Sequence, residues 1–287
     1  MPRSARRILT VTAVAMTAAA TSAMVAAAPA SAAPTFASEA TATLTPGVQA
    51  YTAGAQCTSN FVFTDAAGHI YLGYAAHCAG TGESTDTDGC LTPSLPLGTP
   101  VDFRKGGSLV SEGTRLGGGT LAYSSWRAMA ANGETDADTC ASNDFALVRV
   151  DAADAGTVNP TVPFFGGPDA LGTGTAAGDA VYSYGISSLR GGVSLLSPKV
   201  GASLGDSGGG WSTSLYTVSP GVPGDSGSGF LDADGNALGV LSTLALAPLP
   251  LSNGVGNLRK ELGYAQANSG IAGLQLATGT RAFAPLG

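Results

Sequence analysis

Residues 221–229 read Gly-Val-Pro-Gly-Asp-Ser-Gly-Ser-Gly, and one serine of this stretch, Ser226, stands in a glycine-rich turn directly after Asp225. Glycine lets a backbone fold back on itself, so the Ser226 side chain is expected to be uncrowded. Nearby backbone N–H groups are expected to point at a reacting carbonyl oxygen. Gly-Asp-Ser is also common in ordinary turns, so the stretch indicates a function only together with partners elsewhere in the chain.

Two stretches upstream supply such partners. Residues 73–78 read Gly-Tyr-Ala-Ala-His-Cys and offer His77 as a general base, and residues 143–150 read Asn-Asp-Phe-Ala-Leu-Val-Arg-Val and place Asp144 before an apolar strand. A buried carboxylate on one imidazole nitrogen fixes the tautomer and stabilises the imidazolium that forms when a serine loses its proton. Taken singly, Asp144 has the alternative interpretation of a turn acid before a buried strand, and His77 that of a core histidine. Their joint occurrence with Ser226 favours the catalytic interpretation.

The order of these residues narrows the class of enzyme. The chain has two histidines, His69 and His77, and both precede every candidate serine. An α/β-hydrolase needs serine, acid and then histidine, so that class is excluded, and the Gly-Asp-Ser esterases are excluded because they also need a late histidine. Subtilisin order would need a matching aspartate before His77, and none is present. His-Asp-Ser order remains, and His69 is interpreted as a surface residue of a hairpin.

With that order, the sequence resembles the secreted bacterial members of the chymotrypsin/trypsin-like serine peptidases. Residues 74–78 (Tyr-Ala-Ala-His-Cys) stand for the family's Thr-Ala-Ala-His-Cys, residues 144–148 (Asp-Phe-Ala-Leu-Val) for its Asp-Ile-Ala-Leu, and residues 224–227 for its Gly-Asp-Ser-Gly. The match covers roughly residues 50–267 by motif and spacing. The resemblance implies an all-β fold of two antiparallel Greek-key β-barrels, with the active site in the cleft between them and a short C-terminal helix.

The resemblance also implies a role for each site residue. Ser226 is the expected nucleophile, His77 the general base and then acid, and Asp144 the group that orients His77. The N–H groups of Gly224 and Ser226 are the expected oxyanion hole. No cofactor is expected, and the expected partners are protein or peptide substrates of a monomer.

Composition independently favours β structure. The chain has 42 glycines, and short apolar runs are broken by Gly, Asp and Pro, whereas helical periodicity is scarce. The exception is the helical spacing of Val255, Leu258, Leu262 and Ala265, which predicts the closing helix. Strands are expected at residues 60–64, 69–74, 180–184, 192–196 and 211–218, and in a hairpin at 230–242.

The first 32 residues are expected to direct export. Arg3, Arg6 and Arg7 precede an apolar run, and Ala30-Ser31-Ala32 is typical of a signal-peptide cleavage site, so cleavage is expected near Ala32. A membrane anchor is disfavoured by this small-residue ending, while a twin-arginine signal remains open. The predicted divisions are a signal peptide at 1–32, a propeptide or flexible arm at 33–50, barrels at 51–155 and 156–268, and a tail at 269–287.

The charge balance argues against some partners. Three of the 13 Lys and Arg residues and none of the 20 Asp and Glu residues lie within residues 1–32, so the remainder carries ten basic and 20 acidic residues. An acidic protein with sparse charges is not expected to bind nucleic acid or an anionic membrane surface.

The four cysteines predict two disulfides in an exported chain, and they allow three pairings. The family resemblance favours Cys57–Cys78, which leaves Cys90–Cys140. A zinc site is the competing interpretation, but the spacings fit no zinc motif and no metal is expected.

The substrate pocket is less well defined by the sequence. Counting back from Ser226 without gaps, the position that is acidic in the trypsin branch falls on Pro220, so no preference for Arg or Lys is expected. Ser242, Thr243 and Leu244 are expected to line the pocket. Asp206 would reach the pocket only if the loop before Ser226 aligns with the family differently from this ungapped count.

Asp225 needs a partner if it is buried, because the family's Ile-Val-Gly-Gly amino terminus is missing. Arg127, Arg149 and Arg190 are all candidates for that role. A second Gly-Asp-Ser-Gly at residues 205–208 offers Ser207 as a rival nucleophile. Ser226 is preferred because a strand, a tight turn, a return strand and the helix follow it in order.

Two other functions stay open at this point: a secreted binding module that has lost turnover, and an esterase with the same fold.

Overall fold

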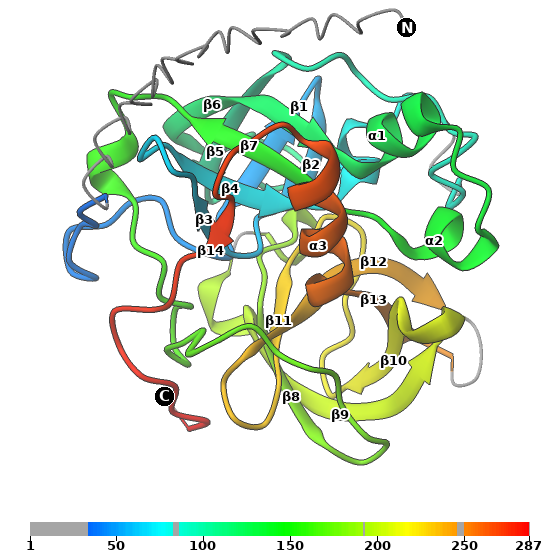
Figure 1. The fold of residues 1–287 in the computed structure, drawn as a ribbon. Coiled ribbons are helices and arrows are strands. Elements are labelled where there is room, and N and C mark those ends of the chain that lie inside the picture. The colour runs from blue at the N-terminus through cyan, green and yellow to red at the C-terminus, as the bar shows by residue number, and fades with distance from the viewer. Residues whose placement is uncertain (1–33, 83–85, 192, 246–249, 287) are drawn as a thin grey trace, which may run out of the picture. The chain divides into compact units, whose positions relative to one another are not determined.

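The computed structural model describes residues 34–82, 86–191, 193–245 and 250–286 (Figure 1). The predicted export segment at residues 1–32 lies outside these ranges. Within them, no helix is both long enough and apolar enough to cross a membrane.

The first half of the chain forms one eight-stranded antiparallel sheet. Consecutive strands pair as hairpins, and its two-residue edge strand comes from the C-terminal tail. In spatial order its strands are β14 (Gln275–Leu276), β3 (Val62–Thr64), β4 (Ile70–Tyr74), β7 (Ala146–Val150), β6 (Thr114–Ser124), β5 (Pro100–Lys105), β1 (Gln49–Thr52) and β2 (Ala55–Thr58).

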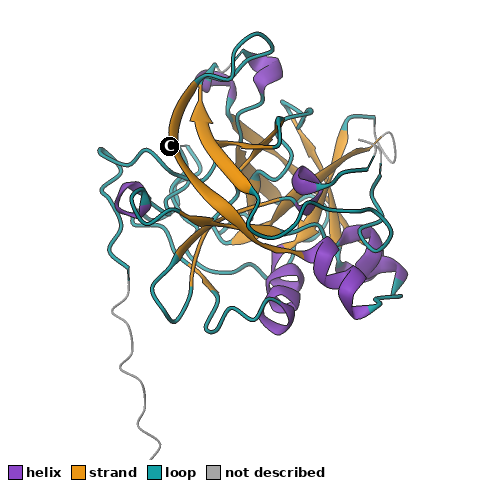
Figure 2. Ribbon diagram, turned by 90° about the horizontal axis from the view of Figure 1, so that it is seen from above, coloured by secondary structure: helices purple, strands orange, loops and turns teal. Residues whose placement is uncertain are grey.

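The second half forms a closed barrel of six antiparallel strands. In spatial order these are β10 (Ser212–Thr217), β13 (Ser252–Asn257), β12 (Ala237–Ala245), β11 (Gly229–Leu231), β8 (Ala180–Tyr184) and β9 (Pro198–Ser207). The predicted all-β class is therefore confirmed, and of the two predicted antiparallel barrels the second is a closed barrel while the first is an eight-stranded antiparallel sheet. The sheets occupy the middle of the molecule and the helices lie at its periphery (Figure 2).

Three α-helices accompany the sheets: α1 (Ser125–Asn132), α2 (Ala137–Ser142) and α3 (Leu258–Asn268). The side chain of Asn257 accepts hydrogen bonds from the N–H groups of Arg259 and Lys260 and so caps the start of α3. Val255, which the periodicity assigned to this helix, lies instead in strand β13. The predicted C-terminal helix is confirmed, and it lies over the region between sheet and barrel (Figure 1).

The prediction of a strand at residues 192–196 is wrong for the described residues 193–196. Ser194–Leu196 form a turn of 3₁₀ helix, and strand β9 begins after it at Pro198. The apolar side chain of Leu195 that suggested a strand is 89% exposed. Strand β9 forms because it pairs with β8 on one side and β10 on the other, which satisfies its backbone on both edges.

The segment at residues 33–50, expected to be a propeptide or flexible arm, is exposed at residues 38–41 and is packed against the fold from Leu44 onward. Leu44 is fully buried, and its backbone hydrogen-bonds to Thr157 and Asn159. The C-terminal tail is likewise anchored, because β14 extends the sheet at β3 and the Phe283 ring packs edge-on against Tyr182 of the barrel at 5.1 Å.

The structure contains both disulfides that the family resemblance favoured, Cys57–Cys78 and Cys90–Cys140. The first joins β2 to the 3₁₀ turn Ala76–Ala79, and the second fixes helix α2 close to the start of β7.

Candidate active site

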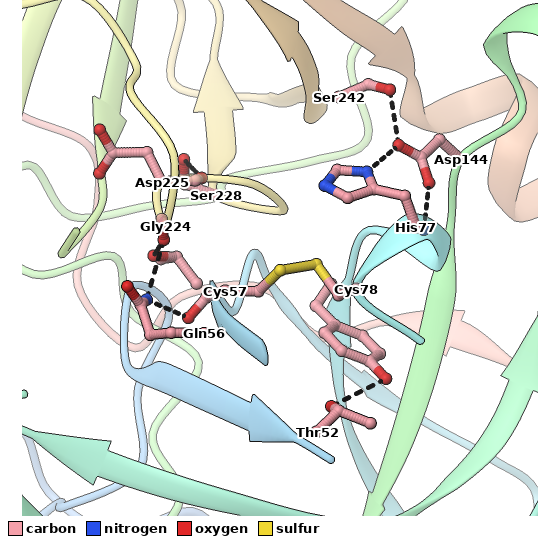
Figure 3. The surroundings of a disulfide bond; sticks show 12 residues. Thr52, Gln56, Cys57, His77, Cys78, Asp144, Gly224, Asp225, Ser228 and Ser242 are labelled. Carbon is pink, nitrogen blue, oxygen red and sulfur yellow. Dashed lines mark hydrogen bonds and ion pairs between the residues drawn. A yellow bond between two sulfur atoms is a disulfide. The ribbon is translucent and has the colours of Figure 1, made fainter. Parts of the chain in front are cut away.

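His77 lies in the 3₁₀ turn Ala76–Ala79, directly after strand β4. Its neighbour Cys78 is tied by the disulfide to Cys57, so the backbone that carries the imidazole is held against β2 (Figure 3). The imidazole Nδ1 lies 2.6 Å from Oδ2 of Asp144, and the His77 N–H donates to Oδ1 of the same carboxylate at 2.8 Å. With Nδ1 protonated toward Asp144, the other ring nitrogen, Nε2, is left free to accept a proton.

Asp144 precedes the buried strand β7 and is itself 3% exposed. Its carboxylate accepts three hydrogen bonds, two from His77 and a third at 2.5 Å from the hydroxyl of Ser242 (Figure 3). A buried carboxylate is stable only when such donors replace water. Ser242, expected at the substrate pocket, therefore also fixes the carboxylate behind the histidine.

His77 and Asp144 shift each other's pKa. Burial by itself would raise the pKa of Asp144, but the charge of His77 and hydrogen bonds from His77 and Ser242 hold the pKa below its usual value. Burial by itself would lower the pKa of His77, and the charge and hydrogen bond of Asp144 raise this pKa above its usual value. Asp144 thus stays a carboxylate and stabilises the protonated imidazole.

Ser226 lies in a turn between the two halves of the molecule. Its carbonyl oxygen accepts a hydrogen bond from the N–H of Thr58 at 2.8 Å, and the N–H of Gly227 donates to Leu241 at 2.7 Å. Gly227 has φ of +88°, and a Cβ there would lie 2.5 Å from the Thr58 oxygen and 2.8 Å from the Ala75 nitrogen. Only glycine fits this approach, because both neighbours are backbone atoms.

His77, Asp144 and Ser226 line one cavity of about 620 Å³. The sequence prediction brought these three residues together from segments 67 and 82 positions apart, and the structure places them around a common space. An imidazole with a free nitrogen, a carboxylate behind it and a hydroxyl in the same cavity form an arrangement suited to nucleophilic catalysis.

Residues 222–225, directly before Ser226, form a β-turn. The N–H of Asp225 donates to the Val222 carbonyl at 2.8 Å, Pro223 occupies the second position, and Gly224 the third with φ of +94°. This pattern is that of a type II turn. Gly224 also lines the cavity, as the expected oxyanion hole requires.

Asp225 is fully buried and is held by two cations. Lys199 Nζ lies 3.2 Å from Oδ1, and Arg190 Nη2 lies 3.1 Å from Oδ2. Of the three arginines considered from the sequence, Arg190 is the partner, whereas Arg127 donates to the carbonyl of Ser94.

Lys199 was not anticipated, because a lysine in a strand is ordinarily a solvent-exposed residue. Its side chain is fully buried, and burial lowers its pKa against the raising effect of the Asp225 charge.

The cavity wall beside Ser226 differs in part from the predicted pocket. Pro220 is not among the described residues that line the cavity, and the wall before Ser226 is formed by residues 221–223. Thr243 and Leu244 are among the residues that line the cavity. Asp206 lies on β9, where it accepts a hydrogen bond from Thr213, and it too is absent from the described lining.

Asn253 also lines the cavity, and no sequence pattern singles it out. It is 1% exposed, and its side chain accepts from the N–H of Gly221 at 2.8 Å and donates to the Gly221 and Thr243 carbonyls. Asn253 thereby joins the two walls of the cavity through one amide group.

Glu261 of α3 contacts the backbone of Asp144, and the sequence did not predict this position. It is fully buried, its Oε1 accepts the Asp144 N–H at 3.1 Å, and its Oε2 has no hydrogen-bond partner in the described part of the chain. Burial, together with the nearby charge of Asp144, raises the pKa of Glu261 well above its usual value. The absence of a Cβ at Gly256 makes room for it, since that atom would lie 2.2 Å from Oε1.

The rival serine, Ser207, lies outside this arrangement. It ends strand β9, its hydroxyl donates to the carbonyl of Ser212 at 3.4 Å, and it is not among the described residues of the cavity. His69 lies beside the Asp65–Gly68 turn with its Nδ1 2.7 Å from Asp65, which agrees with a surface role.

Two groups in the described residues bring together side chains of the types that bind metals. One contains Cys57, His77 and Cys78, and the other Asp88, Cys90 and Cys140. The sulfurs in both groups are joined in disulfides and therefore do not offer thiolates.

Comparisons with known proteins agree with this architecture. No protein-family model matches the chain, and no curated protein matches it. Among solved structures, Thermobifida fusca Protease A is similar with a TM-score of 0.50 and 18% identity, covering 82% of this chain and 99% of that one. A Glu endopeptidase in complex with MPD has a TM-score of 0.50 and 16% identity, covering 82% and 96%. The chain therefore has the double-barrel fold of the chymotrypsin-like serine proteases.

We expect Gly227→Ala to lower the free energy of unfolding by about 2–4 kcal/mol, because the new methyl meets backbone of the other half at a positive φ. Urea denaturation measures the change. Gly263→Ala is the control, since that helical position has nothing within 4 Å and alanine there should stabilise by about 1 kcal/mol. Equal effects of the two substitutions would contradict the close approach.

We expect Glu261→Gln to change how stability depends on pH. The pKa of Glu261 is higher in the folded than in the unfolded chain, so the folded state binds more protons and its stability falls as pH rises above the unfolded value of about 4.5. Glutamine does not titrate, so the stability of the variant relative to the parent should increase from pH 4 to pH 8.

Urea denaturation at several pH values, with Ser226→Ala in both proteins to prevent self-digestion, measures this difference. Glu112→Gln removes a charge at a carboxylate that is 66% exposed and serves as the control. Parallel pH curves for the parent and Glu261→Gln would show that Glu261 is charged in the fold.

Proposed function

We propose that the chain is a secreted serine endopeptidase that hydrolyses peptide bonds through an acyl-enzyme. The observation that carries the proposal is the cavity that Ser226 lines together with His77, whose Nδ1 is 2.6 Å from the buried Asp144 carboxylate. Cleavage of an exported segment near Ala32 and activity as a monomer are parts of the proposal that rest on the sequence.

In the proposed reaction, Ser226 Oγ attacks the carbonyl carbon of the substrate while Nε2 of His77 takes the hydroxyl proton. Asp144 keeps the Nδ1 proton directed toward itself and stabilises the imidazolium. The N–H groups of Gly224 and Ser226 stabilise the negative oxygen of the tetrahedral intermediate.

His77 then gives its proton to the leaving amine, and the acyl-enzyme forms. A water molecule, deprotonated by His77, releases the acid product by the same steps. The chemistry needs no cofactor.

The walls of the cavity support a pocket for apolar or small side chains. Residues 221–223 and 241–244, together with Asn253, contribute no charged side chain to the two walls beside Ser226. The acids that line the cavity in the described chain are Asp144, already bound by three donors, and Asp86 in the loop that follows His77.

We expect a fluorophosphonate probe to label Ser226 in the mature protein, because the probe reacts with a serine activated by a base. Peptide mapping of the adduct measures the site. Ser226→Ala should lose both labelling and casein hydrolysis, whereas the matched Ser207→Ala should keep both. An adduct on Ser207 would overturn the site. Labelling without hydrolysis of casein, but with hydrolysis of a simple acyl ester, would indicate an esterase, and no labelling would indicate a binding module.

We expect peptide anilides with Leu, Phe or Ala before the cleaved bond to have higher kcat/KM than the matched Arg and Lys anilides. A cationic side chain would lose its hydration beside residues 221–223 and 241–244, which offer no carboxylate to replace it. A preference for Arg or Lys of tenfold or more would show that an acid reaches the pocket.

A further inference from the structure

The turn at residues 222–225 has two accessible forms that differ in the direction of one peptide group. In a type II turn the central peptide, here Pro223–Gly224, is rotated by about half a turn relative to a type I turn. Proline at the second position suits both forms, and glycine at the third adopts either sign of φ. The sequence of the turn therefore leaves open which way the Gly224 N–H points.

A hydroxyl from another segment contacts this peptide group. The side chain of Ser187 donates to the carbonyl oxygen of Pro223 at 2.6 Å. The Pro223–Gly224 bond is not among the cis peptides of the described chain, so its C=O and N–H point in opposite directions. With the carbonyl directed at Ser187, the Gly224 N–H is directed away from Ser187, and Gly224 is a residue that lines the cavity.

The direction of the Ser187 hydroxyl is itself fixed. Ser187 is fully buried, and its oxygen accepts the N–H of Leu189 at 3.1 Å as the cap of the 3₁₀ turn Ser188–Arg190. A hydroxyl has one proton to donate. Because the Leu189 N–H faces the hydroxyl as a donor, the single proton is available for Pro223.

The next carbonyl of the turn, that of Gly224, is hydrogen-bonded to side chains of strand β2. The oxygen of Gly224 accepts hydrogen bonds from Thr58 Oγ1 at 2.7 Å and from Gln56 Nε2 at 2.9 Å (Figure 3). These bonds secure the peptide after Gly224. The hydroxyl of Ser187 is the side-chain donor, among the described residues, that secures the peptide before it.

We propose that Ser187 is a positioning residue that keeps the Pro223–Gly224 peptide turned so that the Gly224 N–H faces the reacting carbonyl oxygen. Ser187 does not touch the substrate. It stabilises the form of the turn that donates to an oxyanion over the form that would present the Pro223 carbonyl oxygen in its place. This inference rests on the proposed peptidase function.

The test compares Ser187→Ala with the parent on a peptide ester substrate. Loss of one oxyanion donor in a serine protease costs about 10²–10³ in kcat. Ser187→Ala leaves the donor in place but frees its peptide, so we expect kcat to fall about 10–100-fold while KM changes less than about threefold.

A peptide aldehyde inhibitor gives an independent readout, because its adduct carries the oxyanion. Its affinity should fall by the same factor as kcat, whereas a merely structural defect would not link the two. Ser188→Ala is the matched control: the next residue is half-buried, and its hydroxyl makes no hydrogen bond within the described chain. It should behave like the parent.

Ser187→Cys is the second variant, close in shape but a weak donor, and it remains informative if the alanine variant fails to fold. Its kcat should lie between those of the parent and of Ser187→Ala. Unchanged kcat and aldehyde affinity in both the alanine and cysteine variants would overturn the role of Ser187. A parent protein that neither hydrolyses the ester nor reacts with a fluorophosphonate would instead overturn the proposed function.

Discussion

The close approach of the two halves at Gly227 is the constraint on which the site depends. The Thr58 N–H reaches the Ser226 carbonyl at 2.8 Å, and a Cβ on Gly227 would lie 2.5 Å from the Thr58 oxygen. The same edge of β2 carries Gln56 and the disulfide to Cys78 (Figure 3). One short contact therefore holds the turn of Ser226 against β2, the strand that the disulfide ties to Cys78 next to His77. The motif's last glycine is required by packing and not by chemistry.

Asp144, Asp225 and Glu261 are buried carboxyl groups, and each is stabilised in a different way. Asp144 is stabilised by three donors, and Asp225 by Lys199 and Arg190. Among the described residues Glu261 has neither a cation nor three donors as partners, and burial raises its pKa, which favours the neutral acid. The negative charge next to His77 therefore stays on Asp144, where the imidazolium needs it.

The parts of the fold and of the site that depend on local sequence patterns could be predicted from the sequence. Short-range sequence patterns suffice to predict the three motifs and their order. The same is true of the hairpin after Ser226 and of the closing helix. Strand β9 escaped prediction because Lys199, Gly201 and Gly205 interrupt any alternation of apolar residues, and its pairing partners are distant in sequence. The same holds for Lys199 and Glu261, since a charged residue gives no sign in the sequence that it is buried. The catalytic roles of His77, Asp144 and Ser226 stay predictions.

A crystal structure of the mature protein with a peptide boronic acid would show whether Ser226 is the nucleophile and Gly224 an oxyanion donor. We predict a bond between boron and Ser226 Oγ, with one boronate oxygen about 2.7–3.1 Å from the nitrogens of both Gly224 and Ser226. We also predict that the Pro223 carbonyl still faces Ser187. A boronate oxygen without contact to the Gly224 nitrogen, with the Pro223 carbonyl turned into the cavity, would contradict the account.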